Sequence, residues 1–228
     1  MPSPLSAGKQ KGLEAVADSH GIIAALLIDQ RSALRSLFSR AMGVEAADVP
    51  PESLSQFKEA VSSILTPHAS AALLDPKYGL PAAGKGATNA GLLLAYEQTG
   101  YDKNVPGRMP RLLDRWSVKR LIEAVANAVK LLLHYSSRSS AETNSIKYAF
   151  VEKVGAECAA SDVPFFLELV SNDTFQFGLQ LTAEAGTKFS GVLCGRATWK
   201  DGVGIFVKQG PNALQDWLGR EGIPTSKM

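Results

Sequence analysis

The sequence predicts an α/β fold that is built on a parallel β-sheet. Short, continuous apolar runs alternate along the 228 residues with longer stretches of helical periodicity. A continuous apolar run is typical of a strand that is buried on both faces, as in parallel sheets. Regular alternation of strands and helices favours right-handed crossovers between such strands. No linker or charge run divides the chain, so we expect one domain over residues 1–228.

Each expected strand is a short apolar run, and each expected helix shows apolar residues at helical spacing. The expected strands are Ile22–Ile28, Ala69–Leu74, Gly91–Tyr96, Ala128–Tyr135, Pro164–Leu169 and Ser190–Gly195. The expected helices are Ser53–Leu65, Arg111–Ala126, Ile146–Ala159, Phe175–Ala185 and Ala213–Arg220. Ser53 is expected to cap the first of these helices.

Composition excludes several classes of function. The formal net charge is only +2, from 24 basic and 22 acidic residues, which gives no reason to expect a nucleic-acid partner. The longest apolar run, Ile22–Ile28, is far too short to span a membrane, and the first residues lack an apolar h-region, so we expect no secretory signal. Two distant cysteines, Cys158 and Cys194, fit a reducing compartment. We therefore expect a cytoplasmic protein with no membrane partner; a homo-oligomer stays open.

Polar residues at the ends of the apolar runs are the candidate site, because chemistry in α/β sheets lies outside the carboxyl ends of the strands. Asp29 and Gln30 follow the first run, and Asp75 follows the second. Asp29 could equally cap a helix that begins near Ser32, and Asp75 before Pro76 is typical of a turn.

Lys130 and Glu168 differ from these residues because each lies inside an apolar strand. A charge in that position is costly unless it is paired or functional. The two side chains form either a structural ion pair between neighbouring strands or a working pair of acid/base and electrostatic groups.

Gly195 and Arg196 end the last run and resemble a phosphate-binding pair. Glycine lets a phosphate oxygen approach the backbone amide closely, and arginine adds a charged guanidinium with paired N–H donors. The three histidines His20, His68 and His134 are scattered, without acid or cysteine partners at metal-ligand spacing. We therefore expect no metal and no cofactor. His134 ends a strand, so it either faces a substrate or is a packed side chain, and we expect the packed side chain.

Taken together, these strings resemble the tagatose 1,6-bisphosphate aldolase family of class I aldolases. The resemblance covers nearly the whole chain. It is carried by GIIAALLIDQRSALR, LTPHASAALLDPKYGLP, NAGLLLAYEQTGYD, NAVKLLLHY, VPFFLEL and GVLCGRATW. The family implies a (β/α)8 TIM barrel with its active site at the carboxyl ends of the strands.

The resemblance also implies roles for particular residues. Asp29 and Gln30 would lie in the site at the end of the first strand, and Lys130 on the fourth. Glu168 matches the carboxylate that moves protons around a Schiff base. Gly195 and Arg196 match phosphate contacts of the eighth strand. The implied reaction is cleavage of D-tagatose 1,6-bisphosphate to dihydroxyacetone phosphate and glyceraldehyde 3-phosphate through an imine, which needs no metal.

The chain departs from the family near Leu169–Val170, where the sixth and seventh strands have no counterpart. The sixth strand bears the Schiff-base lysine of the family. At ~30 residues or more per strand–helix unit, at least ~60 residues are absent. Either the polypeptide contains a stretch that these 228 residues omit, or the deletion is genuine, or another lysine has taken over. The alternatives to the aldolase are an inactive phosphosugar-binding or regulatory barrel and a class I aldolase for another phosphorylated ketose.

Overall fold

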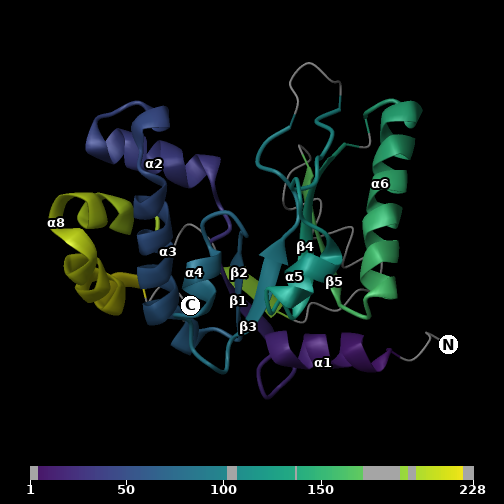
Figure 1. Cartoon of the computed structure of the whole chain (residues 1–228), viewed down its shortest axis with the longest axis horizontal. Helices are drawn as coiled ribbons and strands as arrows, with labels where there is room; N and C mark the ends of the chain where they lie inside the picture. Colours follow the sequence, from purple (N-terminus) through teal and green to yellow (C-terminus); the bar gives the residue numbers. More distant parts are fainter. Residues whose placement is uncertain (1–4, 102–106, 137, 172–190, 195–198, 223–228) are drawn as a thin grey trace.

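A computed structural model describes residues 5–101, 107–136, 138–171, 191–194 and 199–222. Its centre is a curled, fully parallel sheet of six strands in the order β5-β4-β3-β2-β1-β6 (Figure 1). All six expected strands are present. They are β1 (Ile23–Leu27), β2 (Ala71–Leu74), β3 (Gly91–Ala95), β4 (Ala128–Tyr135), β5 (Phe165–Ser171) and β6 (Gly191–Cys194).

Helices lie between the strands from β1 to β5, and each of these crossovers returns the chain to the amino end of the sheet. The helices are α1 (Ala7–Val16), α2 (Ser32–Met42), α3 (Pro51–Leu65), α4 (Leu80–Ala83), α5 (Val118–Glu123), α6 (Ala141–Ala160) and α8 (Gly202–Trp217). Single 3-10 turns lie at Ala46–Asp48 and Thr66–His68, and a π turn lies at Leu218–Gly222. No helix in the described ranges is both long and apolar enough to cross a membrane.

Three of the helix predictions differ from the structure in their bounds. The α3 helix starts at Pro51 and is preceded by Pro50, so the prediction that Ser53 caps it is wrong. Proline is favoured at the first helical position because its missing N–H is not needed there. The α6 helix begins earlier than expected, because the Ser140 hydroxyl accepts a hydrogen bond from Thr143 N. The expected helix Ala213–Arg220 begins in the second part of α8, because a kink with a φ of 83° at Gly210 separates it from a first part that starts at Gly202.

The expected helix over Arg111–Ala126 is mostly wrong, because only α5 is helical there. Leu112 forms an isolated antiparallel bridge with Glu97 instead. Arg115 adopts a positive φ of 62°, which cannot continue a right-handed helix. Leu112, Trp116 and Leu121 still pack on the core, so their spacing reflects burial and not helix, whereas Val125 is 71% exposed. The expected helix Phe175–Ala185 lies outside the described residues.

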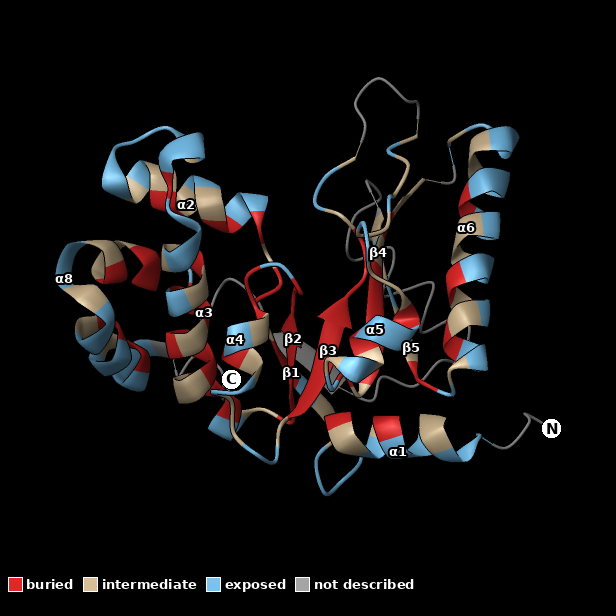
Figure 2. Ribbon diagram, viewed as in Figure 1, coloured by how far each residue is buried: buried red, intermediate tan, exposed pale blue. Residues whose placement is uncertain are grey.

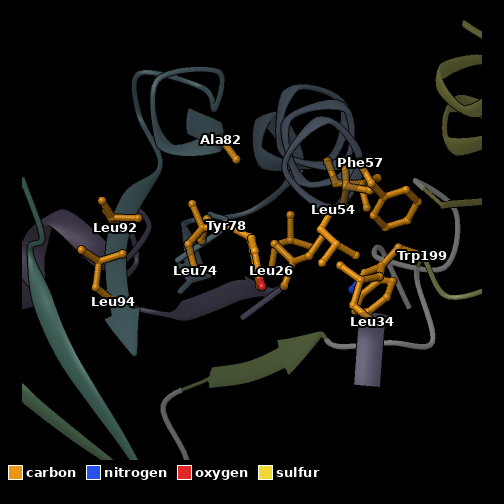
Figure 3. Packing of buried hydrophobic residues seen from close by; sticks show 14 of the residues in the cluster. Leu26, Leu34, Leu54, Phe57, Leu74, Tyr78, Ala82, Leu92, Leu94 and Trp199 are labelled. Carbon is orange, nitrogen blue, oxygen red and sulfur yellow. The ribbon is translucent and has the colours of Figure 1, made fainter. Parts of the chain in front are cut away.

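The sheet divides the apolar residues into two clusters. The larger lies between the outer face of the sheet and α2, α3, α5, α6 and α8. Figure 2 shows β2 and β3 and the inward faces of these helices as buried, and Figure 3 shows part of the packing around Phe57. The smaller cluster lies on the inner face and includes Ala25, Leu73, Leu93 and Phe166.

The α1 helix lies across the amino ends of the strands (Figure 1). It contributes Val16 to the inner cluster. A Cβ on Gly91 would collide with the carbonyl of Ala15, so glycine allows this helix to approach β3 closely. Because α1 covers the amino end, the carboxyl end is where a site can be open to solvent.

Two strands form the edges of the described sheet. The β5 strand runs through Leu169 and Val170 without a break, and these residues pair with Leu133 and His134 of β4. The β6 strand pairs with β1 along its other side. Within the described residues, no further strand pairs with the free side of either.

Candidate active site

The pleat of the sheet brings the candidate residues together. Alternate residues of a strand share a face, so Asp29 continues the inward positions of β1 and Glu97 continues those of β3. Lys130 lies on the same inner face of β4. Glu168 of β5 pairs with Leu132, which places it beside Lys130 across the strands. Four charged side chains therefore meet at the carboxyl end of the sheet.

These four residues, Asp29, Glu97, Lys130 and Glu168, form what we call the Lys130 cluster. The Lys130 ammonium, in a residue 2% exposed, lies 2.9 Å from Asp29 Oδ2, 3.0 Å from Glu97 Oε1 and 2.9 Å from Glu168 Oε2. The expected contact between Lys130 and Glu168 is present. The capping alternative for Asp29 is wrong, because Arg31 is the N-cap of α2 and no side chain caps that helix.

The surroundings change the acidity of the buried members. Burial acts to lower the pKa of Lys130, but the carboxylates of Asp29, Glu97 and Glu168 outweigh it and raise that pKa above its usual value. The ammonium is therefore held charged. Burial raises the pKa of Glu97, against the opposing effect of Lys130.

Glu97 and Arg31 belong to the site although the sequence analysis did not select them. Glu97 Oε2 accepts a hydrogen bond from Leu132 N at 3.0 Å, and Arg31 Nη1 donates to the Glu97 carbonyl at 2.7 Å. Both residues are buried. The available signal was their position directly after an apolar run, which they share with Asp29.

A pocket of about 320 Å³ opens above the Lys130 cluster. It is lined by Asp29, Gln30, Glu97 and Glu168, and on its far side by Tyr101, Arg108 and His134. The Glu168 side chain is 40% exposed, compared with 11% for Asp29 and 7% for Glu97. Glu168 is therefore the carboxylate of the cluster that a ligand reaches most readily.

Gln30 lies in this pocket as expected. Its buried Oε1 has no hydrogen-bond partner among the described residues. A buried polar atom is costly without a partner, and this one lines a pocket where a ligand hydroxyl could donate to it. His134 also lines the pocket and is half-buried, so it is not the fully packed side chain expected from the sequence.

The remaining predicted residues lie elsewhere. Gly195 and Arg196 are outside the described residues, directly after Cys194 at the end of β6. Asp75 forms the expected turn, since its Oδ2 accepts from Tyr78 N at 2.8 Å. It also contacts the fully buried Lys58, which the sequence analysis missed. In the described ranges, no group of three or more His, Cys, Asp or Glu residues could hold a metal ion.

The fold and the Lys130 cluster define a class of protein. It is an α/β protein with a parallel sheet covered at its amino end, and it holds a fixed ammonium and an accessible carboxylate next to a pocket at the carboxyl end. The family model "DeoC/LacD family aldolase" matches residues 23–176. The chain belongs to this family of aldolases.

Curated relatives agree with this assignment. The chain is 39% identical to "Tagatose 1,6-diphosphate aldolase 2" of Enterococcus faecalis, over 96% of this chain and 91% of the relative. It is 33% identical to "Tagatose 1,6-diphosphate aldolase 2" of Streptococcus pyogenes serotype M1, over 98% of this chain and 94% of the relative. The first alignment spans 305 residues although this chain has 228, so the relative carries residues without a counterpart here.

The solved structure of Cgl0159 from Corynebacterium glutamicum shares the fold. It matches with a TM-score of 0.54 and 13% identity, over 92% of this chain and 90% of that chain. Identity at this level supports the α/β fold alone.

Proposed function

We propose that the protein is a class I aldolase that cleaves D-tagatose 1,6-bisphosphate to dihydroxyacetone phosphate and glyceraldehyde 3-phosphate. The observation that carries the proposal is the Lys130 cluster. It places one accessible carboxylate and one held ammonium at the carboxyl end of a parallel sheet. Relatives named tagatose 1,6-diphosphate aldolases support the choice of substrate.

Glu168 is the proposed acid/base of the reaction. It combines the largest exposure in the cluster with a 2.9 Å contact to the Lys130 ammonium. During cleavage, a base takes the proton from the C4 hydroxyl while the C3–C4 bond breaks and its electrons enter the iminium group. The resulting enamine then takes a proton at C3. A carboxylate that both faces the pocket and borders a fixed positive charge suits these transfers.

Asp29 and Lys130 are the proposed electrostatic partners of Glu168, and Gln30 is the proposed contact for a substrate hydroxyl. Lys130 is a poor candidate for the imine amine, because its raised pKa keeps it protonated. Gly195 and Arg196 are proposed to hold one phosphate, at the end of the strand that pairs with β1.

We also propose that the six described strands are part of a (β/α)8 barrel whose sixth and seventh strands are missing from these 228 residues. The pairing of β6 with β1 supports the assignment of β6 as the eighth strand, because the last strand of a barrel closes against the first. The imine lysine of the family would then lie on a strand that this sequence lacks. No lysine is among the residues that line the described pocket.

The second candidate is a non-catalytic phosphosugar-binding or regulatory protein, and the same missing lysine favours it. Reductive trapping separates the two candidates. The purified protein is incubated with dihydroxyacetone phosphate and sodium borohydride, and its intact mass is measured with and without the sugar phosphate.

The aldolase predicts a covalent adduct on a protein whose unmodified mass exceeds 24.3 kDa by several kDa. A mass near 24.3 kDa with no adduct would support the binding protein instead. An adduct that maps to Lys130 would overturn the electrostatic role proposed for that residue. A class I aldolase for another phosphorylated ketose would give an adduct but prefer a different bisphosphate in a cleavage assay.

A further inference from the structure

A second, smaller pocket adjoins the active-site pocket at the carboxyl end of β4. Its volume is about 170 Å³. The two pockets share Arg108, His134 and Val170 in their linings, so they meet at these side chains. The second pocket adds Ser136, Ser139 and Lys147. None of these residues belongs to the Lys130 cluster, and the chemistry proposed for that cluster gives them no role.

Lys147 of α6 is the unusual member of the group. It is only 2% exposed, and within the described residues its ammonium has neither a hydrogen bond nor an ion pair. Lys147 Nζ is not among the fully buried atoms that lack a partner, so the ammonium faces the pocket, where no described anion neutralises it. Burial lowers the pKa of Lys147, and the neighbouring Arg108 lowers it further. Two cations therefore lie close enough to repel each other beside an empty volume.

The backbone next to Arg108 is arranged to bring this side chain to the pocket. Gly107 has a φ of 87°, and a Cβ on it would collide with the methyl group of Thr143 on α6. Arg108 itself has a positive φ of 52°. A non-glycine residue in this region is strained and such strain is concentrated at functional sites. The guanidinium lies over the ring of Tyr101, 5.2 Å from its centre.

His134 supplies a third nitrogen to the pocket. Its Nδ1 is buried and has no partner among the described residues. Burial lowers the pKa of His134, and so do Arg108 and Lys147, while Glu168 acts in the opposite direction. The ring of Tyr101 packs edge-on against the imidazole, with ring centres 5.3 Å apart. An anion in the pocket would relieve the repulsion between the cations and give His134 a partner.

We infer that the pocket formed by Arg108, His134 and Lys147 binds a phosphate monoester, the phosphate at the end of the substrate opposite to the one held by Arg196. This inference rests on the proposed function for the identity of the ligand. Guanidinium, ammonium and hydroxyl groups converging on one volume suit a phosphate dianion. The second pocket lies at the end of β4, and β3, β2 and β1 separate that strand from β6, which Gly195 and Arg196 follow in the sequence.

The spacing along β4 agrees with this placement. Lys130 and His134 are four residues apart on one face of the strand, which is on the order of 13 Å. A short phosphorylated carbon chain can extend from the cluster to the second pocket over that distance. Two phosphate sites on opposite sides of the reacting carbon atoms would fix the orientation of a ketohexose bisphosphate.

The first test measures binding without activity. The chain has three histidines, and His20 and His68 are exposed, so their imidazole NMR signals serve as internal references for His134. Titration with inorganic phosphate should shift the His134 signal saturably and raise its pKa. In Lys147→Met, the phosphate concentration needed should rise at least ~10-fold. Lys153→Met removes an exposed lysine from the same helix and should behave like the wild type.

Thermal unfolding of the same variants excludes a folding defect as the cause. Lys147→Met should unfold at a higher temperature than the wild type in phosphate-free buffer, because it removes an unpaired buried charge. A His134 signal that does not respond to phosphate would overturn the inference. So would a Lys147→Met variant that binds phosphate as the wild type does, or one that loses stability.

The second test decides whether the ligand is the substrate or free phosphate. Cleavage is compared for a ketohexose 1,6-bisphosphate and for the matching 1-phosphate. The substrate assignment predicts that Lys147→Met lowers kcat/KM about 10- to 100-fold for the bisphosphate and leaves the 1-phosphate unaffected. An equal effect on both would contradict it and point to free phosphate. If no cleavage or trapping occurs at all, the proposed function fails while the NMR titration still decides whether the pocket binds phosphate.

Discussion

The two halves of the molecule differ in how completely they bury their apolar side chains. In the half formed by β1, β2, α2, α3 and α8, the rings of Phe38, Phe57 and Trp199 are fully buried. In the half formed by β4, β5 and α6, Leu167 is 38% exposed and Leu169 is 57% exposed. Figure 1 shows these halves on opposite sides of β3. The first half is the more fully packed, and in the second half the free side of β5 pairs with no strand among the described residues.

The same contrast applies to the buried lysines. Lys58 of α3 is fully buried and contacts Asp75, which is fully buried as well. Lys147 of α6 is almost as deeply buried but has no partner among the described residues. One lysine completes a structural ion pair, and the other keeps an unmet requirement for an anion. A buried lysine is therefore a structural element in the first half and a proposed ligand-binding group in the second.

The largest expected effect is on the packed half. Phe57→Ala should lower the free energy of unfolding by about 3–5 kcal/mol, because it leaves a cavity among edge-to-face rings. The matched change in the open half, Leu169→Ala, should alter it by no more than about 0.5 kcal/mol. Urea unfolding of both variants measures the difference. Similar losses for the two would show that β5 is covered in solution.

A smaller loss is expected for Lys58→Met. It should cost about 3 kcal/mol, the low end for breaking a buried ion pair, because Asp75 keeps the hydrogen bond from Tyr78 N. The double variant Lys58→Met with Asp75→Asn should recover most of that stability, since no buried charge then stands alone. A double variant as unstable as the single one would show that the loss came from packing and not from charge.

Activity should respond to Glu168 more than stability does. Glu168→Gln keeps the size of the side chain but cannot act as a base, so cleavage should fall by ~10²-fold or more while substrate binding persists. Single-turnover rates and equilibrium binding of the same variant separate the two effects. Unchanged turnover would remove Glu168 from the proton-transfer role.

The smallest effect concerns Cys158, which lies on the buried side of α6 in the open half. Burial raises the pKa of its thiol to about 12. The thiolate fraction at pH 8 is then on the order of 10⁻⁴, so the thiol should react slowly with alkylating reagents until the pH approaches that value. A Cys194→Ser variant leaves Cys158 as the single thiol to be measured. Rapid reaction at pH 8 would show that α6 separates readily from the sheet.

Much of the site could be predicted because it follows from local rules. Lys130 and Glu168 stand out in the sequence, since charges inside apolar strands are rare and need a reason. The strands were predicted because a continuous apolar run indicates burial on both faces. The helix over Arg111–Ala126 was predicted wrongly because apolar residues on the irregular segment around Leu112 pack on the core with nearly helical spacing.

The sequence by itself determined the fold class, the family resemblance and the members of the site that interrupt an apolar run. Only the tertiary structure decided that Glu97 completes the Lys130 cluster and that Asp29 contacts a lysine and not a helix end. It alone placed Arg108, His134 and Lys147 around one pocket. The physical reason is that strand periodicity is local, whereas pairing between charges depends on which strands and helices lie side by side.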